Sequence, residues 1–290
     1  MYLLLPFAAS VLFVCGLIFV KRASEARIGP ITILFCSNMV SSAAFSLLWL
    51  FGGPGQPWTM LWQPFLIAVI YMIGLTCTFS AVEHGDVSIA TPVFGVKVVF
   101  VAFLLTLTTE ESLSTPVWVA ALLAFAGIVL IQWTSRGHRR RIVFTLVFAL
   151  GAAMSFATFD CLVQRWSPAW GAGRFVPIVY WIVGVMSLAM IPWVQWSRFR
   201  DPAVRRSLLP GTTLVAMQAL CIVLAVSVFG DAARVNVVYA LRGLWGVGLA
   251  WLAARIWGGA EAEHGHRIML QRAAGAVLLT IAVVLAILSH

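Results

Sequence analysis

Long apolar stretches of about 20 residues fill most of the chain, and short clusters of glycine, proline and charged residues separate them. A helix needs about 20 apolar residues to cross the hydrocarbon core of a bilayer, whereas strands of a membrane barrel show shorter, alternating segments. The pattern therefore predicts an all-α membrane protein with ten transmembrane helices. The predicted spans are 2–20, 30–51, 58–82, 88–109, 115–134, 142–163, 175–196, 209–229, 233–257 and 268–288.

Two internal repeats account for the spacing of the charged residues. Lys97 and Arg242 each lie tenth in a predicted span and are 145 residues apart, which is half of the 290-residue chain. Gly85-Asp86 and Gly230-Asp231 share the same offset. We expect a first five-helix repeat over residues 1–134, a basic connecting loop over 135–141 and a second five-helix repeat over 142–290.

The odd number of helices in each repeat fixes their relation. With five spans per repeat, the second repeat enters the membrane in the opposite orientation to the first. Inverted repeats of this kind build many secondary transporters, whose substrate site lies near the midplane between the repeats.

Composition agrees with a membrane protein. The chain is 62% hydrophobic and 10% charged, with a mean hydropathy of +0.99, whereas soluble domains carry about 25% charged residues. The net charge of +9 comes mainly from arginines in short segments beside the spans. They are typical topology determinants, so we expect no nucleic-acid partner. The five cysteines lie inside predicted spans without metal-ligand spacing, and we expect neither a metal nor a cofactor.

The two mid-span cations are the strongest candidates for a binding site. A charge at bilayer depth costs about 2.5–3.5 kcal/mol on insertion scales and is usually kept for a function. Lys97 supplies a mobile point charge, and Arg242 supplies a planar fork that suits carboxylate or phosphate. Residues three positions away share a helix face, which adds aromatic neighbours to each cation. The predicted substrate-binding residues are Lys97, Arg242, Phe94, Phe100, Tyr239 and Trp245.

Three further titratable residues are candidates for a counter-charge or for coupling. Asp160 is the acidic residue well inside a predicted span. It is either an interfacial carboxylate that faces water or Arg165, or a counter-charge for Arg242 or a proton-coupling group. Glu83 and His84 fall in the turn after the third span. They are either solvated turn residues or helix caps, or they form a gate or a proton-linked group.

A set of motifs resembles the EamA-type repeat of the drug/metabolite transporter superfamily. That repeat has a tight turn before its fourth helix, an early Pro-Val, an acidic residue with a nearby leucine before the fifth helix, and a glycine within the fifth. The first half carries Gly85-Asp86, Thr91-Pro92-Val93, Glu110-Glu111-Ser112-Leu113 and Gly127; the second half keeps Glu261 and Gly275, with Val237-Val238 in place of Pro92-Val93. The resemblance implies a helical basket with a central cavity and secondary transport without ATP hydrolysis.

Two other functions compete with a transporter for a small anionic or zwitterionic metabolite. A flippase for a phosphate-bearing lipid or a lipid-linked sugar would use the same cations. An intramembrane enzyme is disfavoured, because the five histidines fall in loops or at the terminus and neither H-E-x-x-H nor G-x-S-x-G occurs. The matched but unequal cations favour alternating access over a channel. The expected partners are the substrate, membrane lipids and a coupling ion or proton.

The distribution of cations predicts the topology. The segments that follow the first, third, fifth, seventh and ninth predicted spans lie on one side of the membrane and hold 14 lysines and arginines. The segments on the opposite side hold 3. Cations gather on the cytoplasmic side, so both termini face away from the cytoplasm, in the inner membrane of a bacterium. A reporter enzyme that works only in the cytoplasm, fused after His290, is expected to be inactive there. An active fusion would reverse the assigned orientation.

Overall fold

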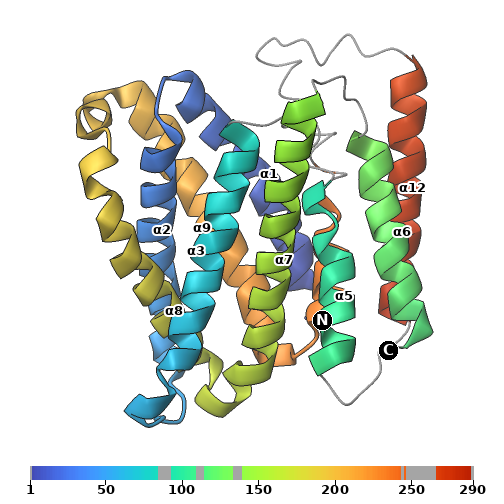
Figure 1. Cartoon of the computed structure of the whole chain (residues 1–290), viewed down its shortest axis with the longest axis horizontal. Helices are drawn as coiled ribbons and strands as arrows, with labels where there is room; N and C mark the ends of the chain where they lie inside the picture. Colours follow the sequence, from blue (N-terminus) through green and yellow to red (C-terminus); the bar gives the residue numbers. More distant parts are fainter. Residues whose placement is uncertain are drawn as a thin grey trace. The chain divides into compact units, whose positions relative to one another are not determined.

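The structure is a computed structural model that describes residues 2–83, 93–108, 114–132, 139–242, 245 and 266–288. Throughout these residues the regular structure is helical (Figure 1). The α-helices are α1 (Leu4–Glu25), α2 (Pro30–Ser46), α3 (Trp62–Glu83), α5 (Lys97–Thr108), α6 (Thr115–Gln132), α7 (Arg139–Trp170), α8 (Ala172–Ser187), α9 (Pro202–Phe229), α10 (Ala232–Tyr239) and α12 (His266–Leu288). Short 3₁₀ segments are η1 (Leu47–Phe51), η2 (Trp58–Met60), η3 (Leu188–Trp193) and η4 (Trp196–Arg200).

Among the described residues, five helical segments are long and apolar enough to cross a membrane. They are Pro30–Phe51, Trp58–Ala81, Val143–Trp170, Ala172–Trp193 and Pro202–Phe229. Shorter apolar helices, Leu4–Val20, Lys97–Leu107 and Thr115–Leu130, lie in the first, fourth and fifth predicted spans. The all-helical membrane fold is thus confirmed, while the number of ten spans stays a prediction. Much of the ninth predicted span lies outside the described residues.

Several helices extend beyond the apolar segments that predicted them. Helix α7 runs from Arg139 to Trp170 rather than over 142–163, because its polar and aromatic ends continue the backbone hydrogen bonding past the apolar part. Helix α9 begins at Pro202 rather than at residue 209. Its cap is readable in the sequence: the Asp201 side chain accepts a hydrogen bond from the Ala203 amide (2.9 Å), and proline suits the first helical position.

The chain divides into two compact units. Unit 1 comprises Met1–Met72 and Leu162–Gly230, and unit 2 comprises Ile73–Cys161 and Asp231–His290. Each unit therefore contains helices from both predicted repeats, and α3 and α7 each contribute residues to both units.

In unit 1, α1 packs against α9, and α2 packs against α8. The Asn38 amide donates a hydrogen bond to the buried Ser187 hydroxyl (2.8 Å), which joins α2 to α8. Nearby, the rings of Phe45 and Tyr180 stack with their centroids 3.6 Å apart. Polar side chains bridge helices in this way where no water is present to bind them.

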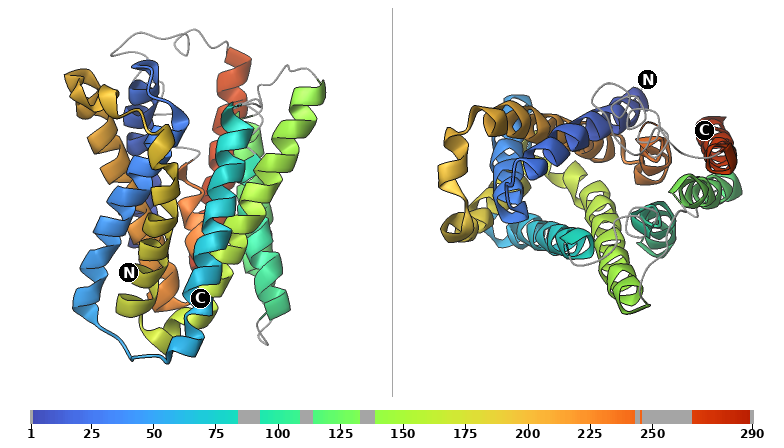
Figure 2. Two further views of the ribbon diagram at one scale, coloured as in Figure 1. Left: turned by 60° about the vertical axis from the view of Figure 1, so that its left-hand side comes forward. Right: turned by 90° about the horizontal axis from the view of Figure 1, so that it is seen from above.

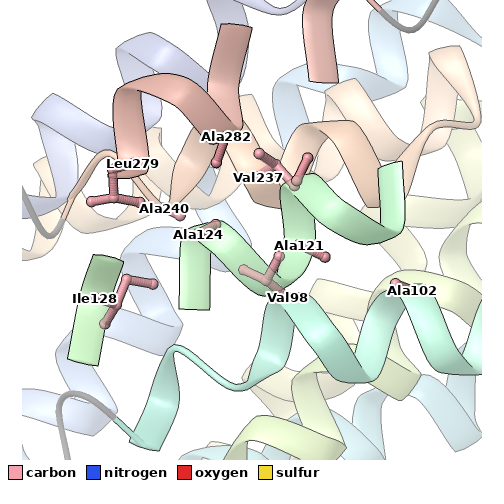
Figure 3. Packing of buried hydrophobic residues seen from close by; sticks show 10 residues of the cluster. Val98, Ala102, Ala121, Ala124, Ile128, Val237, Ala240, Leu279 and Ala282 are labelled. Atoms are coloured by element: carbon pink, nitrogen blue, oxygen red, sulfur yellow. The ribbon is translucent and has the colours of Figure 1, made fainter. Parts of the chain in front are cut away.

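In unit 2, α6 and α12 lie side by side in every view (Figures 1 and 2), and α10 packs against α5, α6 and α12. Small and branched side chains fill the space between these helices, as Figure 3 shows. The buried cluster is Val98, Ala102, Ala120, Ala121, Ala124, Ile128, Val237, Ala240, Leu279 and Ala282.

A pair of glycines from the two repeats sets the approach of α6 to α12. A Cβ atom on Gly127 would lie 2.8 Å from the carbonyl oxygen of Gly275 and 3.1 Å from the amide nitrogen of Leu279. Both of these are backbone atoms, which cannot turn away as a side chain would. Close backbone approach at small residues is a common mode of helix packing in membranes. The two glycines that the repeat motif paired in sequence thus meet in space.

We predict that Gly127→Ala destabilises the protein by about 1–3 kcal/mol, because the added methyl overpacks this contact. Gly151→Ala in α7 is the matched control, since its Cβ would meet only the Cys77 sulfur at 3.4 Å. There the gain in helix propensity is expected to stabilise by about 0.5–1 kcal/mol. Unfolding of the purified variants in mixed detergent measures both changes. Equal stability of the two variants would contradict the packing argument.

Candidate functional site

The fourth predicted span contains an interruption immediately before its lysine. Residues Gly95 and Val96 form a turn, and α5 begins at Lys97. The Val96 amide donates to the carbonyl oxygen of Val93 (3.0 Å), three residues back instead of the four of an α-helix. Regular α-helical bonding resumes when the Phe100 amide donates to Val96 (3.0 Å).

The ninth predicted span contains the same interruption at the same offset. Helix α10 ends at Tyr239, Ala240 and Leu241 form a turn, and helical backbone resumes at Arg242. The Leu241 amide donates to Val238 (3.1 Å), which is the bond from Val96 shifted by 145 residues. Short 3₁₀ stretches inside helices often mark hinges, and interrupted helices carry the binding sites of many transporters. In both spans a cation directly follows the interruption.

An ion pair joins α5 to α7 within unit 2. The Nζ atom of Lys97 lies 2.7 Å from Oδ2 of Asp160, and the two side chains are only 13% and 3% exposed. The amide of Asn236 on α10 donates to the same carboxylate oxygen (2.6 Å) and to the carbonyl oxygen of Ala232 (2.9 Å). The carboxylate therefore receives donors from two helices, which compensates part of the cost of its burial.

The partner of Asp160 differs from those that the sequence suggested. Arg242 and Arg165 were the expected partners, but the ion pair is with Lys97. Because α7 continues to Trp170, Asp160 lies well inside the helix and not one turn from its end. Arg165, five residues later, lies roughly 140° around the helix and so projects from a different face. The interpretation of Asp160 as a water-facing interfacial carboxylate was wrong.

Arg242 lies against an aromatic ring from its own segment. Its guanidinium carbon is 4.5 Å from the centroid of the Tyr239 ring, three residues earlier. A guanidinium over an aromatic face gains a cation–π attraction of about 0.5–2 kcal/mol, the larger values where water is excluded. Tyr239 is buried, so its ring fixes the position of the arginine from a packed surface.

A small cavity brings the two cations together. The space inside it is about 10 Å³, roughly that of one water molecule. Its lining residues are Phe94, Gly95, Lys97, Val98, Ile128, Asn236, Tyr239, Ala240 and Arg242. Both cations and both interrupting turns thus border one space.

The other sequence candidates fall outside this lining. Phe100 and Trp245 are described but do not border the cavity, because the cavity lies at the interruptions and these residues follow them by one helical turn. Glu83 is the last residue of α3, but its side chain and all of His84 lie outside the described part of the chain. Within the described ranges, no three His, Cys, Asp or Glu side chains gather as a metal site.

Asn236 is the site residue that the sequence reasoning missed. The chain has only two asparagines, Asn38 and Asn236, and both fall inside predicted spans. Both prove to be buried and hydrogen-bonded between helices. A polar amide inside an apolar span was therefore the available signal, since such side chains need a partner in the membrane.

Apolar helices with buried charges at a helix interruption define the protein as an all-helical integral membrane protein. Residues 1–133 match the model of the EamA-like transporter family. This match confirms the resemblance seen in the sequence motifs. The matched family is described as one of transporters, which suggests that this chain is a membrane transporter.

A solved structure shares the fold of nearly the whole chain. One solved structure, described only as the crystal structure of a protein, matches with a TM-score of 0.70. The match covers 98% of this chain and 97% of the other at 15% sequence identity, so it shows a shared fold. No curated protein matches the chain.

The buried ion pair makes a clear prediction for stability. Lys97→Met alone is expected to cost about 3–5 kcal/mol, because it leaves the Asp160 carboxylate buried without its counter-charge. Adding Asp160→Leu should recover most of that loss. Unfolding of the two single variants and of the double variant forms the cycle that measures the coupling.

The matched control is the more exposed pair of Arg234 and Asp231, at 2.9 Å with 18% and 17% of the side chains exposed. Arg234→Met should cost less than Lys97→Met, because more water reaches the Asp231 carboxylate that it leaves unpaired. Additive effects of Lys97→Met and Asp160→Leu would show that the two charges do not depend on each other.

Proposed function

We propose that the protein is a secondary transporter for a small anionic or zwitterionic metabolite, with Lys97 and Arg242 binding its acidic group. The observation that carries the proposal is that both cations, from matched positions of the two predicted repeats, line one cavity. Neither residue is near the other in sequence, so the meeting arises from the fold.

The charges favour an anionic ligand. Lys97 and Arg242 are positive and Asp160 is negative, so the ionised group carries a net charge of +1. In a surrounding of low dielectric, this charge attracts anions far more strongly than it would in water. The guanidinium offers two parallel donors to a carboxylate or phosphate, and the ammonium offers a third donor that can move.

The cavity size limits what the described conformation holds. Pockets for drug-sized ligands usually enclose about 300–1,000 Å³, whereas the space in this cavity is only about 10 Å³, roughly that of one water molecule. An acidic head group would therefore need the cavity to widen beside the rings of Phe94 and Tyr239. The rest of a metabolite would occupy space that opens as the interrupted helices bend, in a cycle of alternating access.

The pairing of helices supports ten spans in two inverted repeats. Corresponding helices contact one another: α2 with α8, α5 with α10, and α6 with α12. The first predicted span packs on the eighth (α1 with α9), and the third packs on the sixth, where a Cβ atom on Gly74 of α3 would meet the Phe156 ring of α7. Exchanging the two halves maps this pattern onto itself. With five spans per half the relation inverts the second repeat and places both termini on one side of the membrane. The distribution of cations assigns that side as the one facing away from the cytoplasm of a bacterial cell.

The test is uptake into proteoliposomes across a panel of amino acids, organic acids, sugar phosphates and short-chain phospholipids. We predict that Arg242→Lys weakens the apparent affinity for the transported compound roughly tenfold to a hundredfold, because charge remains but the bidentate contact is lost. Lys97→Ala should weaken it through loss of charge.

Arg234→Lys is the control, since that arginine pairs with Asp231 and does not line the cavity. It should transport at the wild-type rate. If Arg242→Ala and Lys97→Ala also transport at that rate, the cations are structural and the proposal fails. Uptake of the phospholipids alone would replace the metabolite with a lipid substrate.

A further inference from the structure

We propose that Asp160 is an exchangeable counter-ion: the substrate's acidic group displaces it from Lys97, and Asp160 then binds a proton. One anion and one proton would thus enter the site together. The inference rests on the proposed function in taking Lys97 as a ligand for the anion. It adds how binding is coupled to protons.

The geometry gives the ammonium of Lys97 two alternative partners. Lys97 lines the cavity, whereas Asp160, only 3% exposed, is not among the lining residues. An incoming anion therefore approaches Lys97 from the cavity, while the carboxylate holds it from α7 at 2.7 Å. A lysine has a flexible four-carbon stem and three rotatable donors, so it can turn from one anion to the other without moving the backbone.

Displacement leaves a carboxylate that the protein cannot keep ionised. Without Lys97, Asp160 retains the hydrogen bond from Asn236 but loses its ionic partner. A buried carboxylate without a counter-charge costs several kcal/mol, and such groups neutralise instead. A proton from the bulk buffer adds to a carboxylate oxygen of Asp160 and forms the O–H bond there. With a monovalent anion the charge balances, because the anion adds −1 and the proton adds +1, and the site keeps its net positive charge; with a divalent anion the site becomes neutral.

The neighbouring groups leave Lys97 as the partner that changes. Within the described ranges, the charged and titratable residues beside Asp160 are Lys97 on α5, which pairs with it, and Tyr239 on α10. Arg242 packs over the Tyr239 ring. Cys161 follows Asp160 in α7, and its sulfur lies 3.9 Å from the carbonyl oxygen of Val101. On α3, Cys77 lies opposite Gly151, which is more than two helical turns from Asp160. Among the described residues, the printed ion pair of Asp160 is with Lys97.

The test uses acetate and sulfate as probes, because neither ion buffers near neutral pH. Titration calorimetry of the purified full chain, in two buffers of different ionisation enthalpy, gives the affinity and the number of protons bound per anion. The wild-type protein is expected to take up about one proton per anion, and its affinity should rise up to about tenfold for each unit that the pH falls. Asp160→Asn should bind the same probe more tightly, without proton uptake and without that pH dependence.

Asp231→Asn is the matched control. Asp231 is another ion-paired carboxylate of unit 2, but its partner is Arg234 and neither residue lines the cavity. It should retain the wild-type proton count. Asp160→Asn leaves Lys97 without its counter-ion, so this variant should be less stable and should regain stability in acetate. If it cannot be purified, Asp160→Glu keeps a titratable group and should keep the proton uptake, whereas Lys97→Met with Asp160→Asn should lose both anion binding and proton uptake.

Anion binding to the wild-type protein without proton uptake would overturn the exchange, as would proton uptake that persists in Asp160→Asn. Failure of both probes to bind either protein would overturn it too. These results are distinguishable from failure of the transport proposal. Transport that depends on Lys97 and Arg242 but binds anions without protons leaves that proposal standing, whereas transport indifferent to both cations removes it.

Discussion

A lysine in an apolar helix must either reach water or find an anion, and the choice made here organises unit 2. Lys97 finds Asp160, and that contact ties the start of α5 to the middle of α7. Asn236 adds α10 to the same oxygen. Three helices that are distant in sequence are thereby held around one carboxylate, beside the two turns that precede Lys97 and Arg242. The rotation of each helix follows from the need to present these groups to one another.

The helical membrane fold could be predicted from the sequence, because a helix that crosses a bilayer needs a long apolar stretch that is easy to recognise. Apolar length marks a helix, and a charge within that length marks a position that must face protein or water. Lys97 and Arg242 were therefore found by their isolation alone. The helix ends were harder, since the residues from Gln164 to Trp170 continue α7 after its hydropathy has fallen.

The pairing of side chains was beyond the sequence for a physical reason. Whether Asp160 meets Lys97, Arg165 or Arg242 depends on how three helices are rotated, and hydropathy carries little information about rotation when a helix is apolar on every side. Asn236 was visible but unremarked, since a single amide adds little to the polarity of a span. The turns at Gly95 and Ala240 were also missed, because neither Gly95-Val96 nor Ala240-Leu241 carries a proline that would have signalled a break.

The contact between Gly127 and Gly275 has a consequence for how the cavity can change shape. Two backbones in direct contact have no side chain between them whose rotamer could switch. Helices α6 and α12 therefore have little freedom to move against each other and form a rigid pair. The neighbouring α5 begins directly after a turn and α10 ends at one, and the amides in both turns donate to a carbonyl three residues back instead of four. A change in backbone conformation on substrate binding would therefore be confined to the few peptide units of these two turns and would not spread through the bundle.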